Sequence, residues 1–276
     1  MKILVGMLVT IENEYNDCLE SIKAQTFVDY DIYEIRNKPK YIAHNLLYQY
    51  FMNNKQRYDL MIHIAPDMVI VDNNLFRDIV NEFENKYELD RLFIPTFDHF
   101  AGENLGGVNV YRNTVQWDLN KDNYFTDRVH KDYSIRENRK WKISEERPLI
   151  CHCPNPSNYQ AFHLGLHRSI KAFQFGRRNK IYLKSHWMMF NNIKRNYLLK
   201  KDRRLLLALA AARYVISNKL DDTYINYENQ NTYKIYEEIN LMNDDQLYDY
   251  AINNIYMRML TIFGKYSYYL IMYFKK

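Results

Sequence analysis

Residues 60–70 read LMIHIAPDMVI, an apolar run that ends in a carboxylate and then becomes apolar again. A short and almost continuous apolar run is typical of a strand that is buried on both faces of a sheet. Asp67 follows this run directly, where a strand would give way to a loop. Because open α/β sheets bind ligands beyond the carboxyl ends of their strands, the stretch indicates both a fold class and a place for a site.

Strand and helix patterns alternate on both sides of this stretch. The sequence predicts strands at residues 2–9, 31–35, 60–64, 92–94, 108–111 and 148–151, with helices at 14–24, 42–52 and 74–83. Such alternation favours a mostly parallel mixed sheet with helices on both faces. We expect residues 101–107, which contain three glycines, to form a loop, and residues 121–146 to form loops with a short helix.

The pattern changes after Pro156, where the spacing of apolar residues becomes helical. Helices are expected at residues 158–175, 200–218 and 244–274. The chain therefore divides into an α/β domain over residues 1–157 and a helical region over residues 158–276. The aromatic stretch 256–274 predicts either a helix packed on the protein or a partner, or an interfacial helix at a membrane surface.

Composition excludes several classes of protein. The net charge of +5 is too small and too diffuse to indicate nucleic-acid binding. Cys18, Cys151 and Cys153 form no disulfide framework, and Cys151-His152-Cys153 lacks the spaced ligand pairs of a structural zinc site. The first residues carry no signal-peptide pattern, and the longest apolar stretch is too short to cross a bilayer. We expect a cytoplasmic protein, with peripheral membrane contact as an alternative.

Seven short segments occur in an order that is informative as a set. They are SIKAQ (residues 21–25), YIAHN (41–45), APD (65–67), GGVNVYR (106–112), FTDR (125–128), ICH (150–152) and NPSNYQAFHLGLHR (155–168). In this order they resemble the GT-A glycosyltransferases, particularly inverting family 2 and bacterial polysaccharide transferases. The resemblance implies a Rossmann-like GT-A fold over residues 1–157, with a helical C-terminal extension that completes the acceptor side.

The resemblance also implies a role for individual residues. Asp67 and His152 would bind Mn²⁺ or Mg²⁺, and Asp127 would be the catalytic base, with Asp98 and Asp132 as alternatives. The donor, with a UDP-sugar favoured, would contact the following residues: Thr10, Glu12, Asn37, His44, Asn45, Ala65, Pro66 and Gly107. The reaction would be transfer of the sugar to a hydroxyl of a glycan, a lipid-linked molecule or a protein, and a homo-oligomer stays open.

Two residues depart from the family pattern. Ala65 replaces the first acid of the Asp-x-Asp motif, and His44 replaces an arginine. A nucleotide-sugar-binding protein without catalysis is therefore an alternative, as is a transferase acting on nucleic acid or protein. His163 and His167 are four residues apart, a spacing that could hold a metal, but packing or phosphate contact is favoured.

Overall fold

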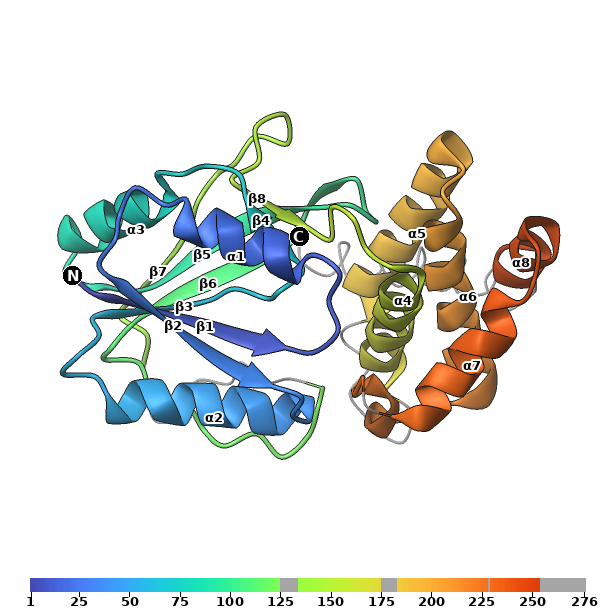
Figure 1. The fold of residues 1–276 in the computed structure, drawn as a ribbon, viewed down its shortest axis with the longest axis horizontal. Coiled ribbons are helices and arrows are strands. Elements are labelled where there is room, and N and C mark those ends of the chain that lie inside the picture. Colours follow the sequence, from blue (N-terminus) through green and yellow to red (C-terminus); the bar gives the residue numbers. More distant parts are fainter. Residues whose placement is uncertain (125–133, 175–182, 228, 254–276) are drawn as a thin grey trace, which may run out of the picture. The chain divides into compact units, whose positions relative to one another are not determined.

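The computed structural model describes residues 1–124, 134–174, 183–227 and 229–253 (Figure 1). Its described residues divide into two compact units. The first comprises Met1–His99 with the residues from Glu103 to Asn155, and the second comprises Phe100–Gly102 with the residues from Pro156 onward. Asp127 and Asp132, the predicted base and one of its alternatives, lie outside the described residues, as does the stretch 256–274.

An eight-stranded mixed sheet forms the first unit, in the order β2-β1-β3-β6-β5-β8-β4, with β7 beside β5. The strands are β1 (Ile3–Val9), β2 (Tyr30–Arg36), β3 (Leu60–His63), β4 (Met68–Ile70), β5 (Leu89–Asp98), β6 (Glu103–Arg112), β7 (Glu137–Lys140) and β8 (Ile150–His152). Parallel pairs join β1 to β2 and β3, and β5 to β7 and β8. Antiparallel pairs join β6 to β3 and β5, and β4 to β8. The expected α/β fold is confirmed.

Helices cover both faces of this sheet. In Figure 1, α1 (Tyr15–Lys23) and α3 (Leu75–Glu84) lie on one face, and α2 (Lys40–Asn53) lies on the other. Alternate residues of β1 face the two layers: Ile3 and Val5 join the core under α1 and α3, whereas Leu4 joins the core under α2. Each fully buried side chain of this size contributes about 1.5–3 kcal/mol of stabilisation.

The prediction of a loop at residues 101–107 was wrong. Only the first part is a turn, since β5 runs to Asp98 and β6 begins at Glu103, so the two strands form a hairpin. Glycine at 107 serves close packing rather than loop formation, because a Cβ there would overlap the carbonyl oxygen of Ile94. Gly106 has a φ of +77°, a backbone conformation that favours glycine.

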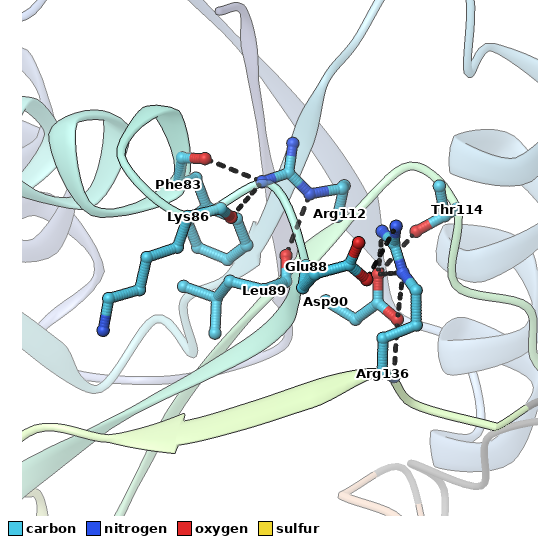
Figure 2. A network of polar contacts seen from close by, with 8 residues as sticks. All are labelled: Phe83, Lys86, Glu88, Leu89, Asp90, Arg112, Thr114 and Arg136. Atoms are coloured by element: carbon cyan, nitrogen blue, oxygen red, sulfur yellow. Dashed lines mark hydrogen bonds and ion pairs between the residues drawn. The ribbon is translucent and has the colours of Figure 1, made fainter.

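A network of buried polar contacts holds together the amino-terminal end of β5 (Figure 2). Asp90 is fully buried and accepts hydrogen bonds from the Arg136 guanidinium at 2.7 Å, the Arg136 backbone N–H at 2.9 Å and the Thr114 hydroxyl at 2.9 Å. Arg112 donates hydrogen bonds to three backbone carbonyls: that of Phe83 in α3, that of Leu89 in β5 and that of Lys86 between them. These bonds fix α3, β5 and β6 to one another at the end of β5 opposite Asp98.

The second unit is helical. Its helices are α4 (Asn158–Phe173), α5 (Leu183–Lys200), α6 (Arg203–Asn218), α7 (Gln230–Asn240) and α8 (Asp244–Ala251), with a short 3₁₀ helix at Asp222–Ile225. Ser157 and Gln160 form a capping box that begins α4. A Cβ on Gly165 would overlap the backbone of Ala208, so α4 and α6 approach closely. Within the described residues, no helix has the length and apolarity that a bilayer-spanning segment needs.

Candidate active site

Several strands of the first unit, among them β1, β3, β5 and β8, end at the same edge of the sheet. β1 and β3 are parallel, and β5 and β8 are parallel to each other, with Asp98 in register with His152. Because β6 is antiparallel to both β3 and β5, the carboxyl ends of β1, β3, β5 and β8 all face the same way. The backbone N–H of Cys153 donates to the carbonyl of Asp67 at 2.7 Å, which fixes the end of β8 to the turn after β3.

Three side chains from these strand ends form a compact cluster. His152 Nε2 lies 3.3 Å from Asp67 Oδ2, and Cys153 Sγ lies 3.4 Å from the same oxygen and 3.6 Å from His152 Nε2. Cys153 is 3% exposed and His152 is 8% exposed, whereas the Asp67 side chain is 19% exposed. One oxygen, one nitrogen and one sulfur thus lie close together, and they could hold a metal ion.

Asp98 fixes the orientation of the His152 ring. Its Oδ2 lies 2.8 Å from His152 Nδ1, and its side chain is 1% exposed. An ionised carboxylate accepts only, so Nδ1 carries a proton. Nε2, which faces Asp67 and Cys153, can donate a proton to Asp67 when the ring is charged, or offer its lone pair to a metal ion when the ring is neutral. This is the carboxylate–histidine arrangement that commonly supports a metal ligand.

The cluster has an excess of electron-pair donors. Asp67 Oδ1 is buried without a hydrogen-bond partner within the described part of the chain. Burial alone would lower the pKa of His152, but Cys153, Asp67 and Asp98 hold that pKa well above its usual value. Burial would likewise raise the pKa of Asp67, but His152 and Cys153 keep it below its usual value. The site therefore favours a positive charge beside Asp67, and a proton or a metal ion can supply it.

Further carboxylates surround the cluster. Glu12 accepts hydrogen bonds from the backbone N–H of Thr10 at 2.7 Å and from its hydroxyl at 2.6 Å. Burial raises the pKa of Glu12, and the charge of Asp67 raises it further. Burial also raises the pKa of Cys18 to about 12, with Asp67 and Glu12 adding to the effect. The raised pKa values of Glu12 and Cys18 both reflect the negative charge of Asp67, which would oppose a diphosphate placed beside it unless a cation offsets that charge.

Several predicted donor-binding residues lie at this edge. Thr10 and Glu12 directly follow β1, and Ala65 and Pro66 form the turn that presents Asp67, with the Ala65 carbonyl accepting from Met68 N–H at 2.9 Å. Asn37 follows β2 with a φ of +51°, and its backbone N–H donates to the Val9 carbonyl at 3.0 Å. The structure thus brings these residues to the edge that carries Asp67 and His152.

The other predicted donor-binding residues have structural partners. His44 donates through Nδ1 to the Lys40 carbonyl at 2.8 Å, and its ring centroid lies 5.2 Å from that of His63 at the end of β3. The Asn45 side chain makes two hydrogen bonds to the backbone of Asn120. It accepts one from the Asn120 N–H at 2.8 Å and donates one to the Asn120 carbonyl at 3.0 Å. Gly107 lies within the sheet, where its lack of a side chain serves the contact with β5.

Asp98 and His163 were also considered for functional roles, and the structure shows the contacts of both. Asp98, an alternative base, is buried and lies 2.8 Å from His152 Nδ1, where it can orient the imidazole ring. His163, in the second unit, donates through Nε2 to the Ile225 carbonyl at 2.7 Å, and its ring stacks on Tyr227 with centroids 3.7 Å apart. These contacts support the packing role of His163.

Sequence reasoning missed Cys153 as part of the site. Residues alternate between the two faces of a strand, so the neighbour of His152 should point away from it. Instead the strand ends at His152, and Cys153 adopts a left-handed φ of +50° that turns its thiol back to the imidazole. No local sequence signal, such as a glycine or asparagine, marks this turn.

Comparisons with known proteins add little to this description. No family model and no curated protein match the chain. Two similar solved structures are A197 from STIV and a cytidylyltransferase from Leptospira borgpetersenii serovar Hardjo-bovis. The first is 16% identical over 35% of this chain and 47% of its own, with a TM-score of 0.27, so the match spans about half of A197. The second is 12% identical over 71% of this chain and 94% of its own, with a TM-score of 0.37. Since both TM-scores are low, we assign the α/β fold from the strand order alone.

Proposed function

We propose that this chain is a glycosyltransferase that uses a nucleotide diphosphate-sugar, with a UDP-sugar favoured, and a divalent cation. The observation that supports the proposal most strongly is the 3.3 Å separation of Asp67 Oδ2 and His152 Nε2. These two residues are 85 positions apart in the sequence, and the family resemblance implies both as metal ligands. They meet at the edge of the sheet where α/β proteins bind nucleotides.

The residues present fit a divalent cation. Asp67, His152 and Cys153 would hold it, and Asp98 would keep the imidazole in the tautomer that presents Nε2. When bound, the cation neutralises the charge that develops on the departing diphosphate. Mg²⁺ prefers an all-oxygen environment, so this mixed set of donor atoms suits it less well than a transition-metal ion.

Charge makes the cation a requirement for donor binding. Two unit negative charges 4 Å apart repel each other by about 4 kcal/mol at an effective dielectric constant of 20. A diphosphate next to Asp67 would meet repulsion of this order, with more from Glu12. We expect that removing the cation abolishes donor binding rather than merely slowing the reaction.

The remaining parts of the chemistry follow the family resemblance. Thr10, Glu12 and Asn37 would contact the nucleoside, and Asp127 would take the proton of the acceptor hydroxyl as it attacks the anomeric carbon. The attack would invert the anomeric centre through an oxocarbenium-like transition state. The first unit would act as the donor-binding domain, and the helical unit would complete the acceptor side.

Donor hydrolysis tests this proposal. Chelator-treated protein is incubated with UDP-sugars, with and without Mn²⁺ or Zn²⁺, and released UDP is measured. We expect cation-dependent release that Asp67→Asn lowers at least about tenfold. Asp78→Asn, which changes an exposed carboxylate on α3, is the matched control and should release UDP at the wild-type rate. Cation-independent release, or equal rates in the two variants, would contradict the proposal.

Ala65 favours a second candidate, a nucleotide-sugar-binding protein without catalysis, because the first acid of the Asp-x-Asp motif is missing. Calorimetry separates the two functions. A binder takes up UDP-sugar in a cation-dependent way but releases no UDP, with or without acceptors.

A further inference from the structure

We propose that Cys153 is the third protein ligand of this site, and that the site selects a zinc-class ion such as Zn²⁺ or Co²⁺ over Mg²⁺. This inference deepens the proposed function, since it identifies the cation and rests on that function only for the cation's role. It also replaces the expectation of Mn²⁺ or Mg²⁺, which followed from the family resemblance.

The two nitrogens of the His152 ring contact two different carboxylates at different distances. His152 Nδ1 lies 2.8 Å from Asp98, the usual length of a charge-assisted hydrogen bond. His152 Nε2 lies 3.3 Å from the Asp67 carboxylate, a longer separation than the bond to Asp98. The same ring thus makes a short hydrogen bond on one side and a longer ion-pair contact on the other.

The longer contact has the length expected within a tetrahedral metal site. Zinc bonds of about 2.0–2.1 Å to nitrogen and oxygen and about 2.3 Å to sulfur place N and O about 3.4 Å apart, and either atom about 3.6 Å from sulfur. The observed separations are 3.3 Å for N and O, 3.4 Å for O and S, and 3.6 Å for N and S. Octahedral Mg²⁺, with bonds of about 2.1 Å, would need neighbouring oxygens about 3.0 Å apart.

The chemistry of the donors agrees with this geometry. Thiolate and imidazole ligands favour zinc-class ions, whereas Mg²⁺ rarely accepts sulfur. Three protein ligands leave a fourth position open for a water or substrate oxygen, which is the pattern of catalytic rather than structural zinc. Asp67 Oδ1, on the same carboxylate, is buried and has no hydrogen-bond partner in the described residues.

The backbone holds Cys153 in place at a conformational cost. A φ of +50° is uncommon for a residue with a side chain, and such conformations concentrate at functional sites. The bond from Cys153 N–H to the Asp67 carbonyl fixes this turn. A nucleophilic role is a poorer explanation of the position of Cys153, because the residue is only 3% exposed.

Cobalt spectroscopy tests the proposal without any need for turnover. Chelator-treated full-length protein is titrated with Co²⁺, and the near-ultraviolet thiolate-to-cobalt charge-transfer band is recorded. We expect one equivalent to produce the band in the wild type, and Zn²⁺ but not excess Mg²⁺ to abolish it. Cys153→Ser should lose the band, and Cys151→Ser, the matched control two residues away, should retain it.

The wild-type spectrum decides the question even if Cys153→Ser fails to fold. Co²⁺ bound without the band, or displaced equally well by Mg²⁺, would overturn the assignment, as would loss of the band in Cys151→Ser alone. The result is also separable from the proposed function. A thiolate band without any UDP-sugar binding would leave the metal site standing and reject the glycosyltransferase. Mn²⁺-dependent donor hydrolysis without a thiolate band would do the reverse.

Discussion

Replacing Asp98 by Asn removes a charge from behind His152 while keeping an oxygen that can accept the Nδ1 hydrogen bond. Asp98 is 1% exposed and lies on the far side of the imidazole from Asp67, so it acts on the site through the ring. We expect Asp98→Asn to weaken metal binding moderately, and Asp98→Ala, which leaves Nδ1–H unpaired, to weaken it more. The order of the two variants is the signature of a positioning residue.

The size of each effect follows from the bond that is lost. A hydrogen bond to a charged group contributes about 1.5–3 kcal/mol, and an ordinary one contributes about 0.5–1.5 kcal/mol. The change from carboxylate to amide therefore costs about 1–1.5 kcal/mol of metal-binding free energy, which is roughly a 5–10-fold loss of affinity. Complete loss of the bond in Asp98→Ala should lower metal affinity roughly 10–100-fold, the range typical of groups that hydrogen-bond a metal ligand.

A second carboxylate on the same strand supplies the control. Asp90 is also fully buried in β5, but it lies at the opposite end and binds Arg136 (Figure 2). Asp90→Asn should lower the free energy of unfolding by about 1.5–3 kcal/mol and leave metal affinity within about twofold of wild type. Zn²⁺ affinity is measured by competition with a chromophoric chelator, and stability by urea unfolding. Equal losses of metal affinity in Asp90→Asn and Asp98→Asn would refute the reasoning, because the effect would then be general.

Three further predictions concern other parts of the chain. Because the pKa of Glu12 is raised in the folded protein, the protonated carboxyl adds to the free energy of unfolding. This contribution is fully present below pH 4.5, the ordinary pKa, and is lost as pH rises through the pKa of the folded state. Glu12→Gln should therefore exceed the wild type in thermal stability at pH 7, and this gain should disappear in acid. Asp127→Asn should abolish sugar transfer while donor binding, measured by calorimetry, persists; full activity would remove Asp127 from the mechanism. Gly165→Ala should cost about 1–3 kcal/mol in urea unfolding, because the new methyl group meets the Ala208 backbone, and an unchanged midpoint would argue against this close contact.

Much of the fold could be predicted from the sequence because its signals are local. The first strands and helices of the sheet have unbroken apolar runs or helical spacing, and their predicted positions agree with β1 to β3 and α1 to α3 within a few residues. In contrast, β7 reads ENRK and has no apolar pattern, since its strand conformation comes only from pairing with β5. α7 was missed although Thr232, Ile235 and Ile239 carry a helical spacing of buried residues.

In the candidate site, too, some residues could be predicted from nearby sequence, whereas others depend on contacts between distant parts of the chain. Asp67 could be predicted because it stands at the end of an apolar run, and His152 because the family resemblance implies a strand-end histidine there. Cys153 could not, because its participation depends on a left-handed turn held by a residue 86 positions away. The closeness of Asp98 to His152 likewise depends on the register of β5 and β8, which no local pattern specifies.

A crystal of the protein soaked with Zn²⁺ and UDP tests the central claim most directly, through anomalous diffraction at the zinc edge. We predict one anomalous peak within about 2.4 Å of Asp67 Oδ2, His152 Nε2 and Cys153 Sγ, with diphosphate oxygens of UDP completing its coordination. A peak elsewhere, or UDP bound away from the ends of β1 and β3 with Asp67 turned from it, would contradict the account.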